Sequence, residues 1–276
     1  MKRLFTHSFG ICIILLSFLL LPFSCTEDKN GDRLLFSIED DKTLGLQVSA
    51  EVDSTYRAKG QLLERNDPRY KDAYQHLDAV IARILNSGKV SYKDEFSWET
   101  RIIKDDNTLN AFATPGGHIY VFTGLIKYLD NEDQLAGVLG HEIAHADKRH
   151  TTKQLQTQYG IALLLSVALG NNPGTLAQIA TGLATLKFGR DAEKEADDYS
   201  VVYLGGTNFY ACNGAAGFFE TMLAGNQGGD TPEFLSTHPD PGGRVQAIHA
   251  KAQQEGCKTT PAGNTSAYQE FKNNLN

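Results

Sequence analysis

Two histidines four residues apart restrict this chain more than any other feature. They lie in the segment Leu139-Gly140-His141-Glu142-Ile143-Ala144-His145, where the pattern of apolar residues predicts a helix from about Glu132 to Arg149. Histidines at this spacing lie on one face of a helix, so both imidazoles can bind one metal ion. Glu142 follows the first histidine and is placed to act as a base rather than as a ligand. The segment therefore predicts one Zn²⁺ per chain, bound by His141 and His145.

A catalytic zinc site needs a third protein ligand, and a charged segment downstream supplies one. Residues 190–197 read Arg-Asp-Ala-Glu-Lys-Glu-Ala-Asp. On a helix, Glu193 and Asp197 share one side, so Glu193 can bind the metal while Asp197 accepts a hydrogen bond from the outer N–H of a ligand histidine. An ordinary solvated helix is the alternative for this segment taken alone. His150 is a rival ligand, but its spacing of nine from His141, without a glycine turn, favours a structural role at the helix end.

The remaining patterns predict an α+β domain that is mainly helical. Amphipathic helices are expected between Lys42 and Ser87, and short strands over residues 100–103, 109–113 and 118–122 predict a small antiparallel sheet beside the zinc-binding helix. Between the two zinc segments, the apolar stretch 161–169 and the helical run 175–186 predict a helical hairpin. We expect the hairpin to cover the core, or else to form a mobile lid or a membrane-contacting element.

The N-terminus has the pattern of an export signal. Lys2 and Arg3 precede an apolar run over residues 11–21, and Ser24 stands directly before Cys25. The run is too short to span a bilayer, and this ending is typical of a bacterial lipoprotein, in which Cys25 becomes the lipidated N-terminus. An ordinary signal peptide cut nearby is the alternative. We expect a signal over residues 1–24, a tether over 25–40, one folded domain over 41–258 and a polar tail over 259–276.

Composition narrows the class of protein further. The chain has 276 residues, 41% of them hydrophobic, and a net charge of −7, so it can bury a core and lacks the basic excess of a nucleic-acid-binding protein. Two of its four cysteines, Cys12 and Cys25, lie in the export segment. Because exported proteins usually pair their cysteines, Cys212 and Cys257 are expected to form a disulfide; two unpaired thiols are the alternative.

Taken together, these residues resemble the gluzincin metallopeptidase family that contains the CAAX prenyl proteases and the heat-shock membrane protease HtpX, and within it the small periplasmic lipoproteins of bacteria. The resemblance is carried by four segments: Asn110 to Gly117, His141 to His145, Glu193 to Asp197, and Thr237-His238-Pro239 with Arg244. It implies a zincin-like metallopeptidase domain over residues 41–258. In this domain Glu193 is the third ligand, and Asp197 accepts a hydrogen bond from a ligand histidine. It also implies an edge strand that pairs with an extended peptide through Asn110, Ala111, Phe112 and Ala113.

The same resemblance implies two further site residues and a function. His238 is expected near the zinc, either donating to the oxyanion of the reaction or filling the open coordination position as a plug. Arg244 either stabilises that charge or tethers the loop through a carboxylate. We expect a zinc endopeptidase of the bacterial envelope, lipid-anchored in the outer membrane and facing the periplasm, which hydrolyses misfolded or unassembled envelope polypeptides. An envelope chaperone or assembly factor with a plugged zinc site, and a lipoprotein with a purely structural zinc, are the alternatives.

Overall fold

The computed structural model describes residues 29–31, 35–225, 233–239, 241–261 and 265–275. The predicted signal, Cys25 and part of the predicted tether, residues 26–28 and 32–34, lie outside these residues. By its internal contacts the chain divides after Leu34, and Leu35–Asn276 form the folded unit described below. Within the described part of the chain, no helix has both the length and the apolar content needed to cross a bilayer.

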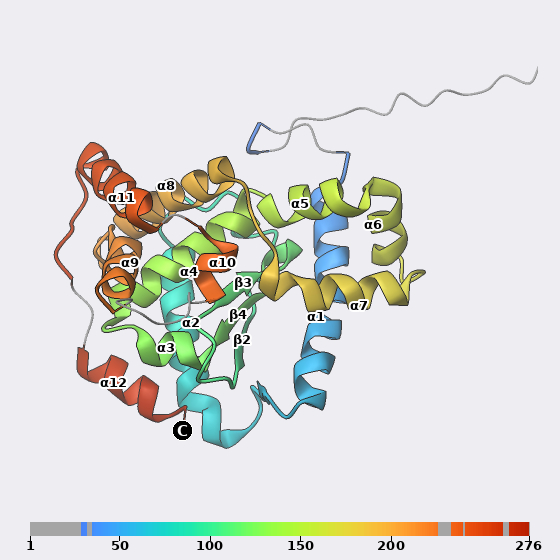
Figure 1. Ribbon diagram of the computed structural model, residues 1–276, viewed down its shortest axis with the longest axis horizontal. Helices are drawn as coiled ribbons and strands as arrows, with labels where there is room; N and C mark the ends of the chain where they lie inside the picture. The colour runs from blue at the N-terminus through green and yellow to red at the C-terminus, as the bar shows by residue number, and fades with distance from the viewer. Residues whose placement is uncertain (1–28, 32–34, 226–232, 240, 262–264, 276) are drawn as a thin grey trace, which may run out of the picture. The chain divides into compact units, whose positions relative to one another are not determined.

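A four-stranded sheet runs through the folded unit, with helices on both of its faces (Figure 1). Its strands, in spatial order, are β1 (Leu62–Leu63), β2 (Thr100–Ile103), β4 (Ile119–Phe122) and β3 (Ala111–Ala113). The β1–β2 and β3–β4 pairs are antiparallel, but β2 and β4 are parallel. The sheet is therefore mixed, and the expectation of a purely antiparallel sheet was wrong. The alternation of side chains along a strand determines which face each side chain occupies, but it does not determine which strand lies beside it. Here β4 lies between β2 and β3, so β2 has a parallel neighbour.

The two faces of the sheet belong to two hydrophobic cores. Ile102 and Val121 enter the first core, whereas their neighbours Ile103 and Tyr120 enter the second, as the alternation of a strand requires. The helices that enclose these cores are α1 (Ile38–Ala58), α2 (Lys71–Leu85), α3 (Thr123–Tyr128), α4 (Glu132–Asp147), α5 (His150–Tyr159), α6 (Ile161–Ala168), α7 (Pro173–Gly182), α8 (Arg190–Thr207), α9 (Gly214–Gly225), α10 (Glu233–Thr237), α11 (Pro241–Glu255) and α12 (Thr265–Asn273). The expected α+β, mainly helical class is confirmed.

Helix α4 lies in the middle of the first core, and every one of its residues is buried. Asn131 caps its start by accepting a hydrogen bond from the Gln134 backbone N–H. The helix ends at Asp147, short of the predicted end, because Arg149 adopts a left-handed conformation with φ of 59°. His150 consequently opens α5 instead of closing α4. The Arg149 guanidinium is buried and lies 2.6 Å from Asp41 of α1, which holds the junction in place.

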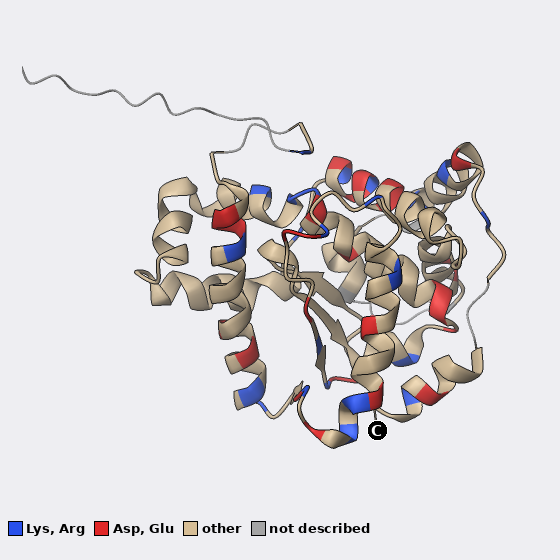
Figure 2. Cartoon of the chain, turned by 180° about the vertical axis from the view of Figure 1, so that it is seen from behind, with Lys and Arg blue, Asp and Glu red and all other residues tan. Residues whose placement is uncertain are grey.

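Helices α6 and α7 form the predicted hairpin, and they pack with α1 around the second core. Leu164, Val167 and Ile179 are buried there, so the expected covering role is confirmed. Residues 161–186 contain no charged side chain, and the hairpin is uniformly tan in Figure 2. Its other expected roles, as a lid or a membrane contact, stay predictions. A short 3-10 turn, η3 (Leu183–Thr185), then leads the chain toward α8.

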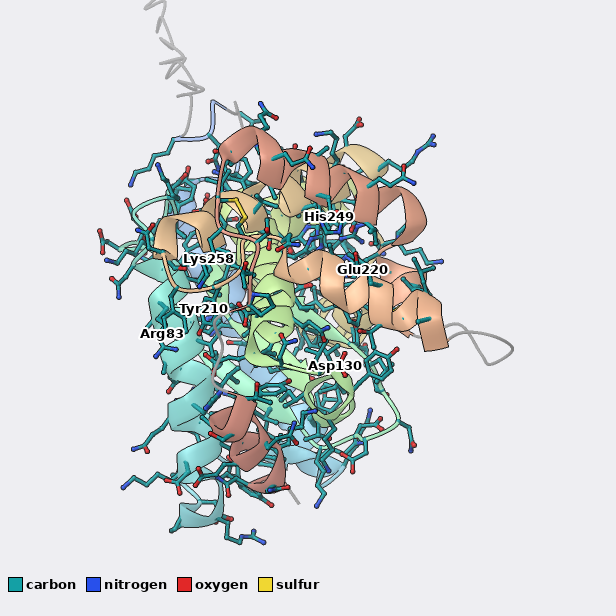
Figure 3. The ribbon with its side chains drawn as sticks, turned by 90° about the vertical axis from the view of Figure 1, so that its left-hand side faces the viewer. Arg83, Asp130, Tyr210, Glu220, His249 and Lys258 are labelled. Atoms are coloured by element: carbon teal, nitrogen blue, oxygen red, sulfur yellow. A yellow bond between two sulfur atoms is a disulfide. The ribbon has the colours of Figure 1, made fainter. Side chains whose placement is uncertain are left out.

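The C-terminal part of the chain is folded where the sequence predicted a polar tail. Helix α12 buries Tyr268 and Phe271 in the first core, and Tyr268 donates a hydrogen bond of 2.7 Å to the Ile126 carbonyl. These apolar residues recur at helical spacing within a polar segment, and the tail prediction overlooked them. Before α12, a disulfide joins Cys212 and Cys257, as predicted, and it lies beside Lys258 (Figure 3).

Candidate metal centre

The metal centre forms where α4 and α8 pack closely side by side. Gly140, directly before the first motif histidine, makes this approach possible, because a Cβ atom there would lie 2.9 Å from both Ser200 Oγ and Leu204 Cδ1 of α8. The Ser200 hydroxyl also donates a hydrogen bond of 2.8 Å to the Gly137 carbonyl of α4. The close contact brings the side chains of α8 to the histidine face of α4.

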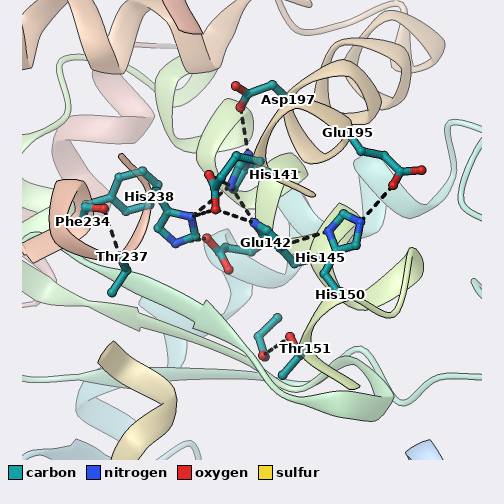
Figure 4. A network of polar contacts seen from close by, with 12 residues as sticks. His141, Glu142, His145, His150, Thr151, Glu195, Asp197, Phe234, Thr237 and His238 are labelled. Atoms are coloured by element: carbon teal, nitrogen blue, oxygen red, sulfur yellow. Dashed lines mark hydrogen bonds and ion pairs between the residues drawn. The ribbon is translucent and has the colours of Figure 1, made fainter. Parts of the chain in front are cut away.

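Four buried side chains converge at this contact (Figure 4). His141 and His145 come from α4, Glu193 from α8, and His238 from the chain directly after α10, and their ligand atoms all lie within 4.8 Å of one another. The two Nε2 atoms of His141 and His145 are 2.9 Å apart. The Glu193 carboxylate lies 3.5 Å from His141 Nε2 and 3.6 Å from His145 Nε2.

This donor set fits a zinc ion. Two imidazoles and one carboxylate are a common set of protein ligands for catalytic zinc, with the remaining position left for water or substrate. One proton between the two Nε2 atoms would give a hydrogen bond, whereas a cation at this place accepts the lone pairs of both His141 and His145. Beside the cluster, Oε1 of Glu142 is buried and has no hydrogen-bond partner among the described residues, so this carboxylate is available for chemistry. The residues present therefore fit the predicted metal.

Asp197 lies behind the first histidine, where it was predicted. Its Oδ1 is 2.9 Å from His141 Nδ1, the ring nitrogen that points away from the cluster. Arg244 of α11 donates to both Asp197 oxygens at 2.7 Å, and its Nη1 lies 2.9 Å from Glu193 and 3.3 Å from the His238 carbonyl. The guanidinium is buried against two carboxylates and the loop that carries His238. This position matches the tethering role of the two that were considered for Arg244.

His238 lies inside the ligand cluster. Its Nδ1 is 2.9 Å from Glu193 Oε1 and 3.3 Å from His141 Nε2, while its Nε2 lies 3.7 Å from Glu142. The ring stacks on Phe234 with centroids 4.3 Å apart, so α10 supports it from one side. The position is therefore that of a fourth ligand.

Three residues near the cluster were not predicted as site residues from the sequence, or were assigned a different role. The Nδ1 of His150 lies 3.0 Å from the outer nitrogen of His145, on the side away from the metal, and its Nε2 lies 3.1 Å from Glu195. Phe188, between η3 and α8, stacks on His145 with ring centroids 4.0 Å apart. Glu195 could have been noticed, because it belongs to the charged segment of Glu193. Nothing in the sequence marks Phe188, since only the path of the chain after η3 brings it to the site.

The predicted edge strand borders the cluster. Strand β3 is the last strand of the sheet, and Ala111, Phe112 and Ala113 line a recess together with Glu142 and His238; its free volume is only about 10 Å³. The preceding residue, Asn110, donates a hydrogen bond of 2.8 Å from its side chain to the Ala184 carbonyl of η3. Leu183, Leu186 and Phe188 close the opposite side. Pockets for ligands usually measure roughly 300–1,000 Å³, so the segment from Leu183 to Phe188 has to move before a peptide can enter.

The protein groups of the cluster have strongly altered acidities. Burial opposes the charge on His141, but hydrogen bonds with Asp197 and Glu193 prevail and raise the pKa of His141 to about 9. Burial and the neighbouring charge on His141 hold the pKa of His145 well below its usual value. Burial raises the pKa of Glu142 to about 8, whereas the pKa of Glu193 is lowered, against burial, by His238 and His141.

Comparison with known proteins agrees with this geometry. The sequence profile described as Peptidase family M48 matches residues 72–252, which span all the site residues of α4, α8 and α11. The chain is 30% identical over 216 residues to the mitochondrial metalloendopeptidase OMA1 of Schizosaccharomyces pombe, covering 77% of this chain and 61% of that protein. It is 29% identical to the metalloprotease YcaL of Escherichia coli strain K12, covering 76% and 78% of the two chains. It is 30% identical to the beta-barrel assembly-enhancing protease of the same strain, covering 68% of this chain and 40% of that protein.

A profile match over more than half of the chain carries more weight than any single relative, since the chain spans only part of two of these three proteins. The matched region also contains the whole ligand set of α4 and α8. The chain therefore belongs to peptidase family M48, and its site is that of a metallopeptidase.

Proposed function

We propose that this chain is a zinc-dependent endopeptidase of the bacterial cell envelope. The observation that carries the proposal is the buried cluster of His141, His145 and Glu193, with the Glu142 carboxylate beside it and the edge strand β3 along the same recess. A metal centre beside a strand edge is typical of a site that binds an extended peptide. The main-chain hydrogen bonds of such an edge can bind peptides of many different sequences.

The chemistry follows from the positions of the protein groups. His141, His145 and Glu193 would hold a zinc ion, which would supply a Lewis acid for the scissile carbonyl and for a nearby water. Glu142 takes the proton of the attacking water and passes it to the leaving amine. Burial raises the pKa of this carboxyl in the protein without metal, and the charge of a bound zinc ion would lower it again, toward the range in which it can both take and give a proton. The residues of β3 hold the substrate backbone in line with these groups.

The position of His238 supports the plug role more than the oxyanion role. Its Nδ1 lies within the same 4.8 Å cluster as the ligand atoms, at the place that a substrate carbonyl would need. Productive binding then requires His238 to leave, together with the segment that carries Phe188. We infer a resting form in which both the fourth position and the strand edge are covered.

The setting of the enzyme extends this proposal. The export pattern at the N-terminus supports an outer-membrane lipoprotein that is anchored through Cys25 and faces the periplasm. The names of the bacterial relatives, a metalloprotease and a beta-barrel assembly-enhancing protease, support a part in the quality control of envelope proteins. The proposed substrates are misfolded or unassembled envelope polypeptides.

The test is the cleavage of casein by the purified mature chain, with its zinc content measured in parallel. We expect Glu142→Gln to keep its zinc and to lower the rate by roughly 10²–10⁴-fold, because the proton carrier is lost. Glu220→Gln, which makes the same change at an exposed ion pair with His249, is the matched control and retains the wild-type rate. Full activity of the Glu142→Gln protein with zinc bound would refute the assignment.

A second function is favoured by the same plug. If His238 stays in place, the chain acts as an envelope chaperone or assembly factor that binds unfolded proteins at the strand edge without cutting them. His238→Ala separates the two functions, because release of the plug increases cleavage by a peptidase. A zinc-loaded protein that cleaves nothing in either form, and cells that are rescued by Glu142→Gln, would favour the chaperone.

A further inference from the structure

The outer nitrogen of the second motif histidine has an unusual partner. His145 is fully buried, and its Nε2 faces the ligand cluster, so its Nδ1 must find a hydrogen bond within the protein. That partner is not a carboxylate or a carbonyl but another imidazole, since His145 Nδ1 lies 3.0 Å from His150 Nδ1.

The path of the chain explains how His150 reaches this place. In one continuous helix, residues five apart point in different directions, because each residue turns the helix by about 100°. Here the helix is interrupted by the left-handed Arg149, with φ of 59°, and α5 starts anew at His150. A left-handed residue other than glycine costs free energy, and the buried ion pair of Arg149 with Asp41, together with its hydrogen bonds to Phe36 and Ser37, stabilises it.

The far side of His150 contacts α8. Its Nε2 lies 3.1 Å from Glu195 Oε2, and the His150 side chain is 3% exposed whereas that of Glu195 is 46% exposed. Glu195 is two residues from the ligand Glu193, and it therefore points away from the cluster on the same helix. The contacts form a row from solvent to the metal position: Glu195, His150, His145.

The hydrogen positions in this row follow from the contacts. If His145 gives its Nε2 lone pair to a metal, its proton is on Nδ1, and this N–H donates to His150. His150 Nδ1 must then be an acceptor without a proton, which leaves its single proton on Nε2. That N–H donates to Glu195, and an ionised carboxylate can only accept. Each group thereby determines the tautomer of the next one.

We propose that His150 and Glu195 are positioning residues of the metal centre, which hold the tautomer and the ring plane of His145 as Asp197 holds those of His141. Helix α8 then serves all three ligands: Glu193 binds directly, Asp197 orients His141, and Glu195 orients His145 through His150. This inference rests on the zinc centre of the proposed function but not on peptidase activity, so its test measures metal binding.

The experiment compares zinc affinity, by competition with a chelator, among variants of the mature chain. We expect His150→Leu and Glu195→Ala to weaken zinc binding by roughly 10–100-fold, the usual effect of losing an outer partner of a ligand. His150→Asn recovers most of this loss, because its amide oxygen can accept from His145 while its NH₂ donates to Glu195. Asp191→Ala is the matched control: it removes the same charge from an exposed position one turn earlier on α8 and leaves affinity unchanged.

A second readout follows the tautomers themselves. Nitrogen-15 chemical shifts of the rings in the zinc-loaded wild type should show His145 protonated at Nδ1 and His150 at Nε2, and Glu195→Ala should remove the preference of His150. The melting temperature of each metal-free variant shows whether it folds, and Glu195→Ala changes only a half-exposed side chain. Wild-type zinc affinity in both His150→Leu and Glu195→Ala, while Asp197→Ala loses affinity, would overturn this inference alone. A wild type that binds no zinc would overturn the metal centre as well.

Discussion

At the scale of single residues, the metal centre depends on the hydrogen-bond partners of its ligand histidines. His141 is buried beside Asp197 and Glu193, and these two carboxylates raise its pKa to about 9 against the effect of burial. Burial and the nearby charge on His141 lower the pKa of His145. In the metal-free protein, His141 therefore carries a proton, and zinc must displace this proton to bind.

This proton makes zinc binding depend on pH in a defined direction. Below a pH of about 9, the metal-free protein carries the proton on His141, so each zinc ion that binds releases it. We expect the zinc affinity to rise by about tenfold per pH unit from pH 6 upward and to level off near pH 9, where His141 is already neutral. Chelator competition across this range, with the chelator's own protonation accounted for, measures the slope. A flat profile would show that His141 is neutral throughout.

At the scale of elements, the close packing of α4 against its neighbours places the ligands. Gly140 lies against Ser200 and Leu204 of α8, and Gly137 lies against the start of α9, where a Cβ atom would come within 2.0 Å of the Ala215 backbone nitrogen. Glycine is a poor helix former, and its presence in a fully buried helix has a packing reason here. The two glycines let α8 and α9 pack closely on α4, and the approach of α8 places Glu193 beside the two histidines.

The substitution Gly137→Ala tests whether α4 needs glycine here for close packing. The added methyl group meets backbone atoms that cannot rotate away, so we expect a loss of about 1–3 kcal/mol in the free energy of unfolding, in spite of the better helix propensity of alanine. Gly174→Ala in α7 is the control, because no atom lies within 4 Å of its added Cβ, and it should be neutral or slightly stabilising. Urea denaturation of the metal-free proteins measures both. Equal stability of the two variants would contradict the packing argument.

At the scale of the whole folded unit, segments far apart in the sequence stabilise one site. Helix α11 carries Arg244 to Asp197 and Glu193, and the disulfide between Cys212 and Cys257 ties the chain after α11 to the chain after α8. Arg83 and Tyr210, which are drawn below the disulfide in Figure 3, both donate a hydrogen bond to Glu132 and so join α2 to the start of α4. The site is thus held by helices from both halves of the chain.

Removal of the disulfide should lower stability without removing the ligands. For a sequence separation of 45 residues, the chain-entropy model predicts a loss of about 4 kcal/mol for Cys257→Ser. Thermal or urea denaturation measures it, and a reducing agent should destabilise the wild type by a similar amount while leaving the variant unchanged. A variant as stable as the oxidised wild type would show that the folded helices alone hold α11.

Local patterns were enough to predict much of the fold and the site. Periodicity and spacing over a few residues predicted the strand at residues 100–103, the strand at 118–122 to within one residue, the hairpin of α6 and α7, and the ligands His141, His145 and Glu193. The order of the strands, the docking of α12 and the position of His150 did not follow, because each depends on a contact between residues far apart in the chain. The alternation of apolar residues shows which face of a strand is buried, but it does not show which strand pairs with it.

The sequence by itself determined the chemistry of this protein, since a helix puts histidines four residues apart on one face whatever surrounds it. It showed equally that the first 25 residues have the pattern of an export signal and that Cys212 and Cys257 lie outside this pattern, which favoured their pairing. Only the tertiary structure decided that His238 enters the ligand cluster, that Phe188 and η3 cover the strand edge, and that Glu195 reaches His145 through His150. These contacts depend on the close approach of α4 and α8, which Gly140 permits but does not specify, and on a left-handed turn at Arg149, which no local pattern marks.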